Sequence, residues 1–138
     1  MGRILAIDFG RKRTGIAVTD TLQLIANGLA TVATAQLMDF LKAYVAKESV
    51  ELIVVGQPKQ MDNTPSESMR YLMPFLARLA KEIPEMPVVM YDERFTSVLA
   101  HRAMLDGGMK KMARRDKSIV DEISATIILT DYLNSARR

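Results

Sequence analysis

The chain has 138 residues, of which 49% are hydrophobic and 25% charged. This length and composition predict one compact domain over residues 1–138. It contains no cysteine and one histidine, so disulfides and thiolate metal sites are excluded. Any bound metal would then be held by carboxylates, which favour Mg²⁺ or Mn²⁺. The net charge of +3 permits an anionic partner. No stretch approaches the ~18 apolar residues of a membrane span, and Asp8 interrupts the segment that a signal peptide would need, so we expect a cytoplasmic protein without a membrane partner.

Two strands are predicted first, over residues 3–9 and 13–20, and the short turn between them makes them antiparallel neighbours. The first strand is apolar on both faces, as in the centre of a sheet. Its alternation places Asp8 at the end of the row that contains Ile4 and Ala6. A third strand is expected over residues 22–33, with a bend or bulge at Asn27-Gly28.

Helices and strands then alternate. Apolar spacing predicts a helix over residues 36–48, a buried strand over 51–56, and a helix from residue 64 that Pro74 kinks or divides. A strand over 87–91 follows, then a helix from residue 96 or 97 to the Gly107-Gly108 pair, and a last helix over 118–135.

These elements predict an α/β fold with a five-stranded mixed sheet, three strands antiparallel and two parallel, and helices on both faces. Right-handed crossovers would place the later parallel strands beside the first. The carboxyl ends of the first, fourth and fifth strands then share one edge, which is where such sheets bind ligands.

Acidic residues are expected to gather at that edge. Asp8 ends the first strand, Asp92 and Glu93 follow the fifth, and Asp121 lies one turn into the final helix. Since successive strand residues face opposite ways, one of the pair Asp92 and Glu93 would join Asp8. Three such carboxylates could hold two divalent cations and promote phosphodiester hydrolysis.

Each acid also has a structural explanation. Asp121 comes three residues after Ser118 and could complete a capping box or interact with the helix dipole. Glu93 could form an ion pair with Arg94, and Asp8 could pair with a nearby arginine.

Two basic runs flank the acidic edge. The first run consists of Arg11, Lys12 and Arg13 in the first turn, and the second of Lys110, Lys111, Arg114, Arg115 and Lys117 before the last helix. Arg94, next to Glu93, is a further candidate for binding nucleic acid. Solvated surface is the ordinary explanation for such runs, but two runs beside one acidic edge favour contacts with nucleic-acid phosphates. No aromatic residues are interleaved with them to suggest base stacking. His101 is interpreted as a helix-surface residue, with a proton shuttle as the alternative.

Four stretches resemble, in order, the signatures of the YqgF family, also called RuvX or Holliday junction resolvases. They are DFGRKRTGIA (8–17), VGQPKQMD (55–62), DERFTS (92–97), and VDEISA with IIL (120–125 and 127–129). The resemblance implies a ribonuclease H-like fold and, for bacterial members, endonucleolytic processing of the precursor of 16S ribosomal RNA. It also implies that the family's acidic residues correspond to Asp8, Glu93 and Asp121. Gln57 and Asn63 depart from the family pattern and bear on substrate contacts.

The hypothesis is therefore a hydrolase acting on ester bonds, in which Asp8, Glu93 and Asp121 hold Mg²⁺ or Mn²⁺ and the basic residues hold phosphates. One alternative is a resolvase of branched DNA, which would be a homodimer because four-way junctions are two-fold symmetric. The other is a non-catalytic nucleic-acid-binding factor of ribosome assembly. The expected partners are precursor rRNA or branched DNA and ribosomal particles, with the protein a monomer or homodimer.

Overall fold

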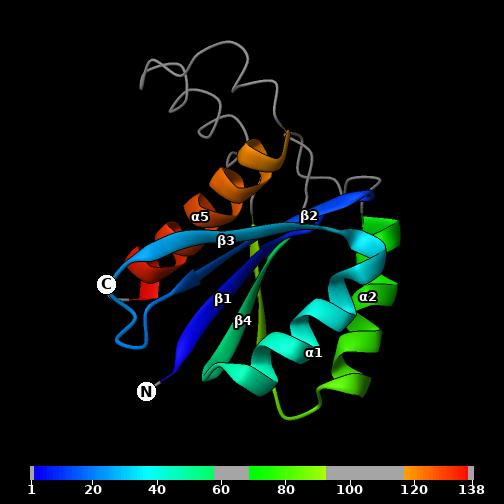
Figure 1. Ribbon diagram of the computed structural model, residues 1–138, viewed down its shortest axis with the longest axis horizontal. Helices are drawn as coiled ribbons and strands as arrows, with labels where there is room; N and C mark the ends of the chain where they lie inside the picture. The colour runs from blue at the N-terminus through cyan, green and yellow to red at the C-terminus, as the bar shows by residue number, and fades with distance from the viewer. Residues whose placement is uncertain (1, 58–68, 93–116, 137–138) are drawn as a thin grey trace.

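The computed structural model describes residues 2–57, 69–92 and 117–136, without the side chains of residues 57, 69, 92, 117–121 and 136. Within these ranges the chain forms a five-stranded sheet in the order β3-β2-β1-β4-β5 (Figure 1). β1 (Arg3–Asp8), β2 (Arg13–Thr19) and β3 (Ala26–Ala33) are antiparallel neighbours, whereas β4 (Val50–Gln57) and β5 (Val88–Asp92) extend the sheet in parallel from β1. The predicted mixed sheet is confirmed.

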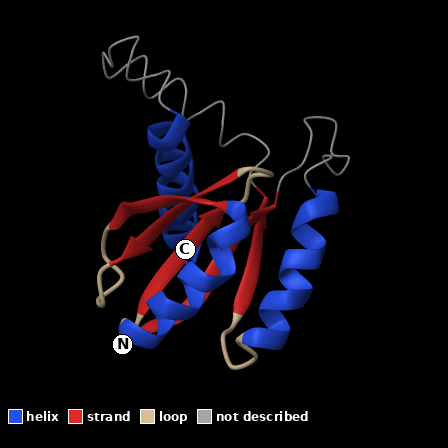
Figure 2. Cartoon of the chain, turned by 45° about the vertical axis from the view of Figure 1, so that its right-hand side comes forward, coloured by secondary structure: helices blue, strands red, loops and turns tan. Residues whose placement is uncertain are grey.

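Helices cover both faces of the sheet, as predicted (Figure 2). A short 3-10 helix, η1 (Thr34–Gln36), leads into α1 (Leu37–Lys47), which lies with α2 (Met69–Glu82) on one face. α5 (Lys117–Ala136) covers the other face. The strand order therefore buries β1 between two helical layers.

The alternation of β1 divides the core into these two layers. Leu5 and Ile7 pack with residues of α1 and α2, while Ile4 and Ala6 pack with residues of α5. Leu5, Ala6 and Ile7 are fully buried. Burial of a large aliphatic side chain contributes about 1.5–3 kcal/mol to the stability of the fold. β1 is therefore firmly held in the sheet, and so is Asp8 at its carboxyl end.

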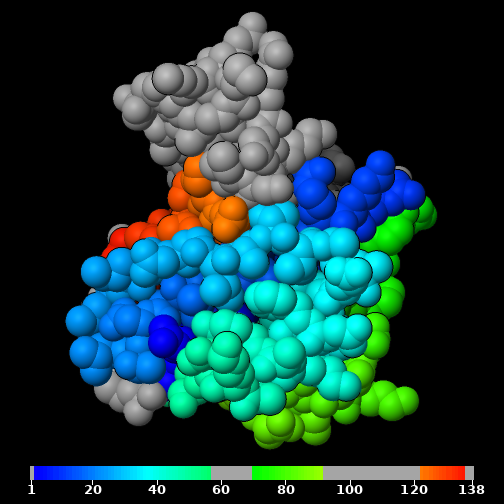
Figure 3. Space-filling model, viewed as in Figure 1, coloured from blue at the N-terminus to red at the C-terminus, as the bar shows by residue number. Residues whose placement is uncertain are grey.

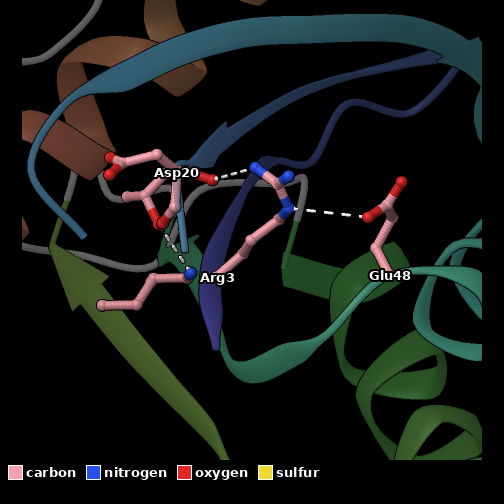
Figure 4. Close-up of polar contacts among 5 residues, drawn as sticks. Arg3, Asp20 and Glu48 are labelled. Carbon is pink, nitrogen blue, oxygen red and sulfur yellow. Dashed lines mark hydrogen bonds and ion pairs between the residues drawn. The ribbon is translucent and has the colours of Figure 1, made fainter. Parts of the chain in front are cut away.

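The amino end of β1 is tied to two neighbouring elements (Figure 4). Arg3 Nη1 donates to the carbonyl oxygen of Thr19 at 3.0 Å, and Arg3 Nε lies 3.7 Å from a carboxylate oxygen of Glu48, which follows α1. The Ile4 N–H donates to the Thr19 hydroxyl at 2.9 Å. This polar cluster lies at the end of β1 opposite to Asp8 and links β1 to β2 and to the end of α1.

The third strand begins at Ala26, so the prediction that it starts near residue 22 is wrong. The Asp20 carboxylate accepts the backbone N–H groups of Leu22, Leu24 and Ile25 at 3.2, 2.9 and 3.0 Å. These bonds fold residues 20–25 into a loop and occupy donors that an extended strand would present. The predicted bulge is confirmed: pairing passes from Ala30 to Gly28, so the irregularity lies directly after Gly28.

The helices differ from prediction at two positions. α2 continues through Pro74, which therefore does not divide it within the described part. The apolar spacing of this helix predicts that both Leu72 and Met73 face the core, but Met73 is 55% exposed and only Leu72 is fully buried. The predicted start of α2 at residue 64 and the predicted helix after residue 96 lie outside the described residues.

None of the helices in the described part of the chain combines the length and the apolarity that crossing a bilayer requires.

Candidate functional site

The carboxyl ends of three strands meet at one edge of the sheet, as the sequence predicted. β1 and β4 are parallel with Ile7 opposite Val55, and β4 and β5 are parallel with Val55 opposite Met90. Each strand ends within two residues of these partners. Ligands of sheets with this topology bind at such an edge.

Asp8 is the last residue of β1 and lies half-buried at this edge. It follows Ile4 and Ala6 on the face covered by α5, because alternate residues of a strand share a face. Its antiparallel partner on β2 is Gly15, which places no side chain beside the carboxylate. The sequence has therefore put a charged group on a central strand and a glycine next to it.

The amino end of α5 points toward the same edge. Near the other end of α5, Leu133 shares a pocket with Ala26, the first residue of β3. Nearer its start, Glu122 lies beside Gly28, which pairs with Ala17, the partner of Ala6. Glu122 therefore lies on α5 at the level of Ala6, two residues before the carboxyl end of β1.

The structure describes only part of the predicted carboxylate set. Glu93 follows directly on Asp92, the last residue of β5, but Glu93 and Arg94 lie outside the described residues, as does the side chain of Asp121. Among the residues that are described, no three carboxylate, histidine or cysteine side chains form a group that could hold a metal ion. The assignment of Asp8, Glu93 and Asp121 as metal ligands thus stays a prediction.

The first basic run forms the β1–β2 turn beside Asp8, with Arg11 and Lys12 exposed. Thr34, from η1, holds this turn in place: its hydroxyl donates to the Gly10 carbonyl at 2.6 Å and its N–H donates to the Lys12 carbonyl at 2.9 Å. A Cβ on Gly10 would lie 2.1 Å from the Arg13 carbonyl oxygen, so the turn requires glycine there. The exposed cations are therefore held on a rigid support.

The second basic run cannot be placed in the same way. Lys110, Lys111, Arg114 and Arg115 lie outside the described residues, and so does His101. Lys117 is the first residue of α5, without a described side chain.

A residue that the sequence interpretation missed lies against the β1–β2 turn. The guanidinium carbon of Arg11 is 4.8 Å from the centroid of the Tyr71 ring, on α2. No local sequence signal marks this pair, because the two residues belong to distant elements.

The sequence pattern of the RuvX family, described as "Holliday junction resolvase", matches residues 2–135. The chain belongs to the RuvX family. The mixed sheet with helices on both faces is the ribonuclease H-like fold of RuvX proteins, as the sequence resemblance implied.

Relatives with known names match the chain over almost its whole length. A protein of Phocaeicola vulgatus is 65% identical over 137 residues, and one of Bacteroides thetaiotaomicron is 64% identical over 137 residues. Both matches cover 99% of each chain. A Porphyromonas gingivalis protein is 55% identical over 138 residues and covers both chains completely. All three carry the name "Putative pre-16S rRNA nuclease".

Proposed function

We propose that this protein is a cytoplasmic, metal-dependent endonuclease that hydrolyses phosphodiester bonds in the precursor of 16S rRNA during ribosome biogenesis. The observation that carries the proposal is the position of Asp8. Asp8 is a half-buried residue at the carboxyl end of the central strand. The carboxyl end of β5 lies at the same edge of the sheet, and the amino end of α5 points toward it. The names of full-length relatives support the choice of RNA as the substrate.

The carboxylates proposed for this edge would suit a hard divalent cation. Asp8, Glu93 and Asp121 supply only carboxylate oxygens, which suit Mg²⁺ or Mn²⁺. Gly15, the residue opposite Asp8 on β2, has no side chain of its own at this position. When bound, the metal would lower the pKa of a water molecule and stabilise charge on the leaving oxygen.

The protein's own cations would bind and orient the nucleic acid. Arg11, Lys12 and Arg13 belong to a turn that Thr34 fixes beside Asp8, so phosphates held there lie near the candidate metal ligands. Arg94, Lys110, Lys111, Arg114, Arg115 and Lys117 are proposed as further phosphate contacts. Contacts of this kind give affinity without base specificity.

The test is an in vitro cleavage assay on fragments of precursor 16S rRNA, with Mn²⁺, with Mg²⁺ and with a chelator. Asp8→Asn should lower the cleavage rate at least ~100-fold, because metal-assisted stabilisation of the transition state is worth several kcal/mol. The matched control is Asp39→Asn, which makes the same change at an exposed position of α1 and should cleave normally. Undiminished cleavage by Asp8→Asn, or by the wild type in chelator, would contradict the proposal.

The family description favours one second candidate, cleavage of four-way DNA junctions. The same assay on junction DNA separates the two, since a resolvase would make paired cuts as a homodimer. Binding of RNA without cleavage of either substrate would instead indicate a non-catalytic factor of ribosome assembly.

A further inference from the structure

A groove of about 390 Å³ lies between the β1–β2 turn and α2, on the face of the sheet opposite to the Asp8 side chain. We call it the Tyr71 groove. Its lining includes Phe9, Arg11, Thr34, Tyr71, Phe75 and Arg78. In Figure 3 the blue atoms of the β1–β2 turn lie next to the green atoms at the start of α2.

The Tyr71 groove combines flat surfaces with positive charge. The Arg11 guanidinium stands over the Tyr71 ring, and Tyr71 is 40% exposed. Arg78 donates to Glu82 through Nε, and a guanidinium carries four further N–H donors. None of the described lining residues is acidic. The groove is therefore complementary to an anionic ligand that also has a planar ring.

The groove is also rigid. Its floor contains the rings of Phe9 and Phe75, whose centroids are 5.3 Å apart. Phe9 is buried, and Thr34 fixes the backbone of the turn that carries Arg11. A preformed surface loses little entropy when a ligand stacks on it.

We propose that the Tyr71 groove binds a single-stranded segment of nucleic acid, with one base stacked on the Arg11–Tyr71 pair and the adjacent phosphates against Arg11 and Arg78. Unpaired bases stack on aromatic rings and on guanidinium planes, and phosphates are neutralised by arginine. A duplex keeps its bases stacked on one another and has none to offer the groove. The proposal rests on the proposed function only in taking nucleic acid as the substrate.

The groove and the candidate catalytic edge can serve one strand. Asp8 and Phe9 are consecutive, yet Asp8 faces α5 and Phe9 faces α2. The turn that contains Arg11 and Lys12 joins the two faces. A strand that leaves the groove across this turn reaches the edge where Asp8 lies, so the groove would hold a single-stranded flank of the substrate.

The test measures binding rather than cleavage, by fluorescence anisotropy. The probe is a labelled single-stranded RNA of about 12 nucleotides, and the protein is the full chain carrying Asp8→Asn, so that the RNA is not cut. In that background Tyr71→Ala should weaken binding about 5- to 150-fold, the range given by loss of one base–aromatic stack. Tyr71→Phe should bind within about twofold of its parent, since the ring remains. The matched control is Met73→Ala, an exposed position of the same helix outside the groove lining, which should not change binding.

Three further probes assign the contact. An RNA of equal length with abasic positions should bind more weakly, and Tyr71→Ala should weaken it no further. Single-stranded DNA of the same sequence should show the same loss in Tyr71→Ala, because the proposed contacts are to a base and to phosphates, which RNA and DNA share; no loss on DNA would contradict them. Arg78→Gln should reduce the dependence of log affinity on log salt concentration by about 0.7, the value for one phosphate on a single strand.

Unchanged RNA binding by folded Tyr71→Ala would overturn the proposal, as would an equal loss on abasic or duplex RNA. Because binding is measured in a background that cannot cleave, failure of the groove leaves the cleavage assay intact. Conversely, a protein that binds through the groove and cleaves nothing would refute the proposed function alone.

Discussion

Replacing Gly10 by alanine is expected to force open the turn that joins β1 to β2. The added methyl carbon would lie 2.1 Å from the carbonyl oxygen of Arg13, whereas favourable non-bonded contacts lie near 3.5 Å. The obstructing atom belongs to the backbone, so no side-chain rotation can relieve the overlap. The turn itself must move, and with it the peptide groups that Thr34 binds.

The expected loss of stability follows from two opposing effects. Overpacking of this kind costs about 1–3 kcal/mol, and the smaller conformational freedom of alanine in the unfolded chain offsets about 0.4–1 kcal/mol of it. The net change is a decrease of about 1–2 kcal/mol in the free energy of unfolding. With a denaturant slope of about 2 kcal/mol/M, the urea midpoint should fall by about 0.5–1 M.

Gly28→Ala is the matched control. A Cβ on Gly28 would meet the Glu122 Cβ at 3.4 Å and the Thr126 hydroxyl at 3.6 Å. These are ordinary contacts, so Gly28→Ala should stay within about 0.5 kcal/mol of the wild type. Urea unfolding followed by circular dichroism compares the variants. Coincident midpoints for the Gly10 and Gly28 variants would refute the reasoning.

Two further predictions concern the helical core and the β2–β3 loop. Leu72→Ala should destabilise the protein by about 2–5 kcal/mol, because Leu72 is fully buried. Met73→Ala should cost less than about 1 kcal/mol, because Met73 is 55% exposed. Equal urea midpoints for the two variants would contradict the packing of α2. Hydrogen bonds from backbone N–H groups, first that of Ile25 and then those of Leu24 and Leu22, lower the pKa of Asp20. The ionised Asp20 carboxylate therefore stabilises the fold above about pH 4, and this stabilisation is lost as the pH falls through the lowered pKa. The melting temperature of the wild type should therefore exceed that of Asp20→Asn at pH 7, and the difference should narrow as the pH is lowered below about 4. A difference independent of pH would show that the carboxylate does not act through its charge.

Much of the fold could be predicted because its signals are local. The apolar run of β1, the turn after Asp8 and the helical spacing of α1 depend on neighbouring residues, and their arrangement follows from rules of handedness and pairing. The start of β3 was missed because a single side chain, Asp20, binds three backbone N–H groups that the pattern assigned to a strand.

The candidate site could be predicted only in part. The sheet edge and the place of Asp8 follow from topology, whereas the positions of Glu93 and Asp121 relative to Asp8 depend on side chains outside the described residues. The Tyr71 groove could not be predicted at all. Arg11 and Tyr71 meet because α2 packs beside the first turn, and no periodicity within either segment records that contact.

The alternation at the end of β1 has a consequence for how accurately this strand must be held. If β1 slipped by one residue, Asp8 and Phe9 would exchange sides, so that the carboxylate would turn toward the aromatic floor and the phenyl ring toward α5. Hydrogen bonding to β2 on one flank and to β4 on the other prevents this displacement. Correct strand alignment is therefore a condition for both proposed surfaces at once, and a lesion in β1 would disable them together.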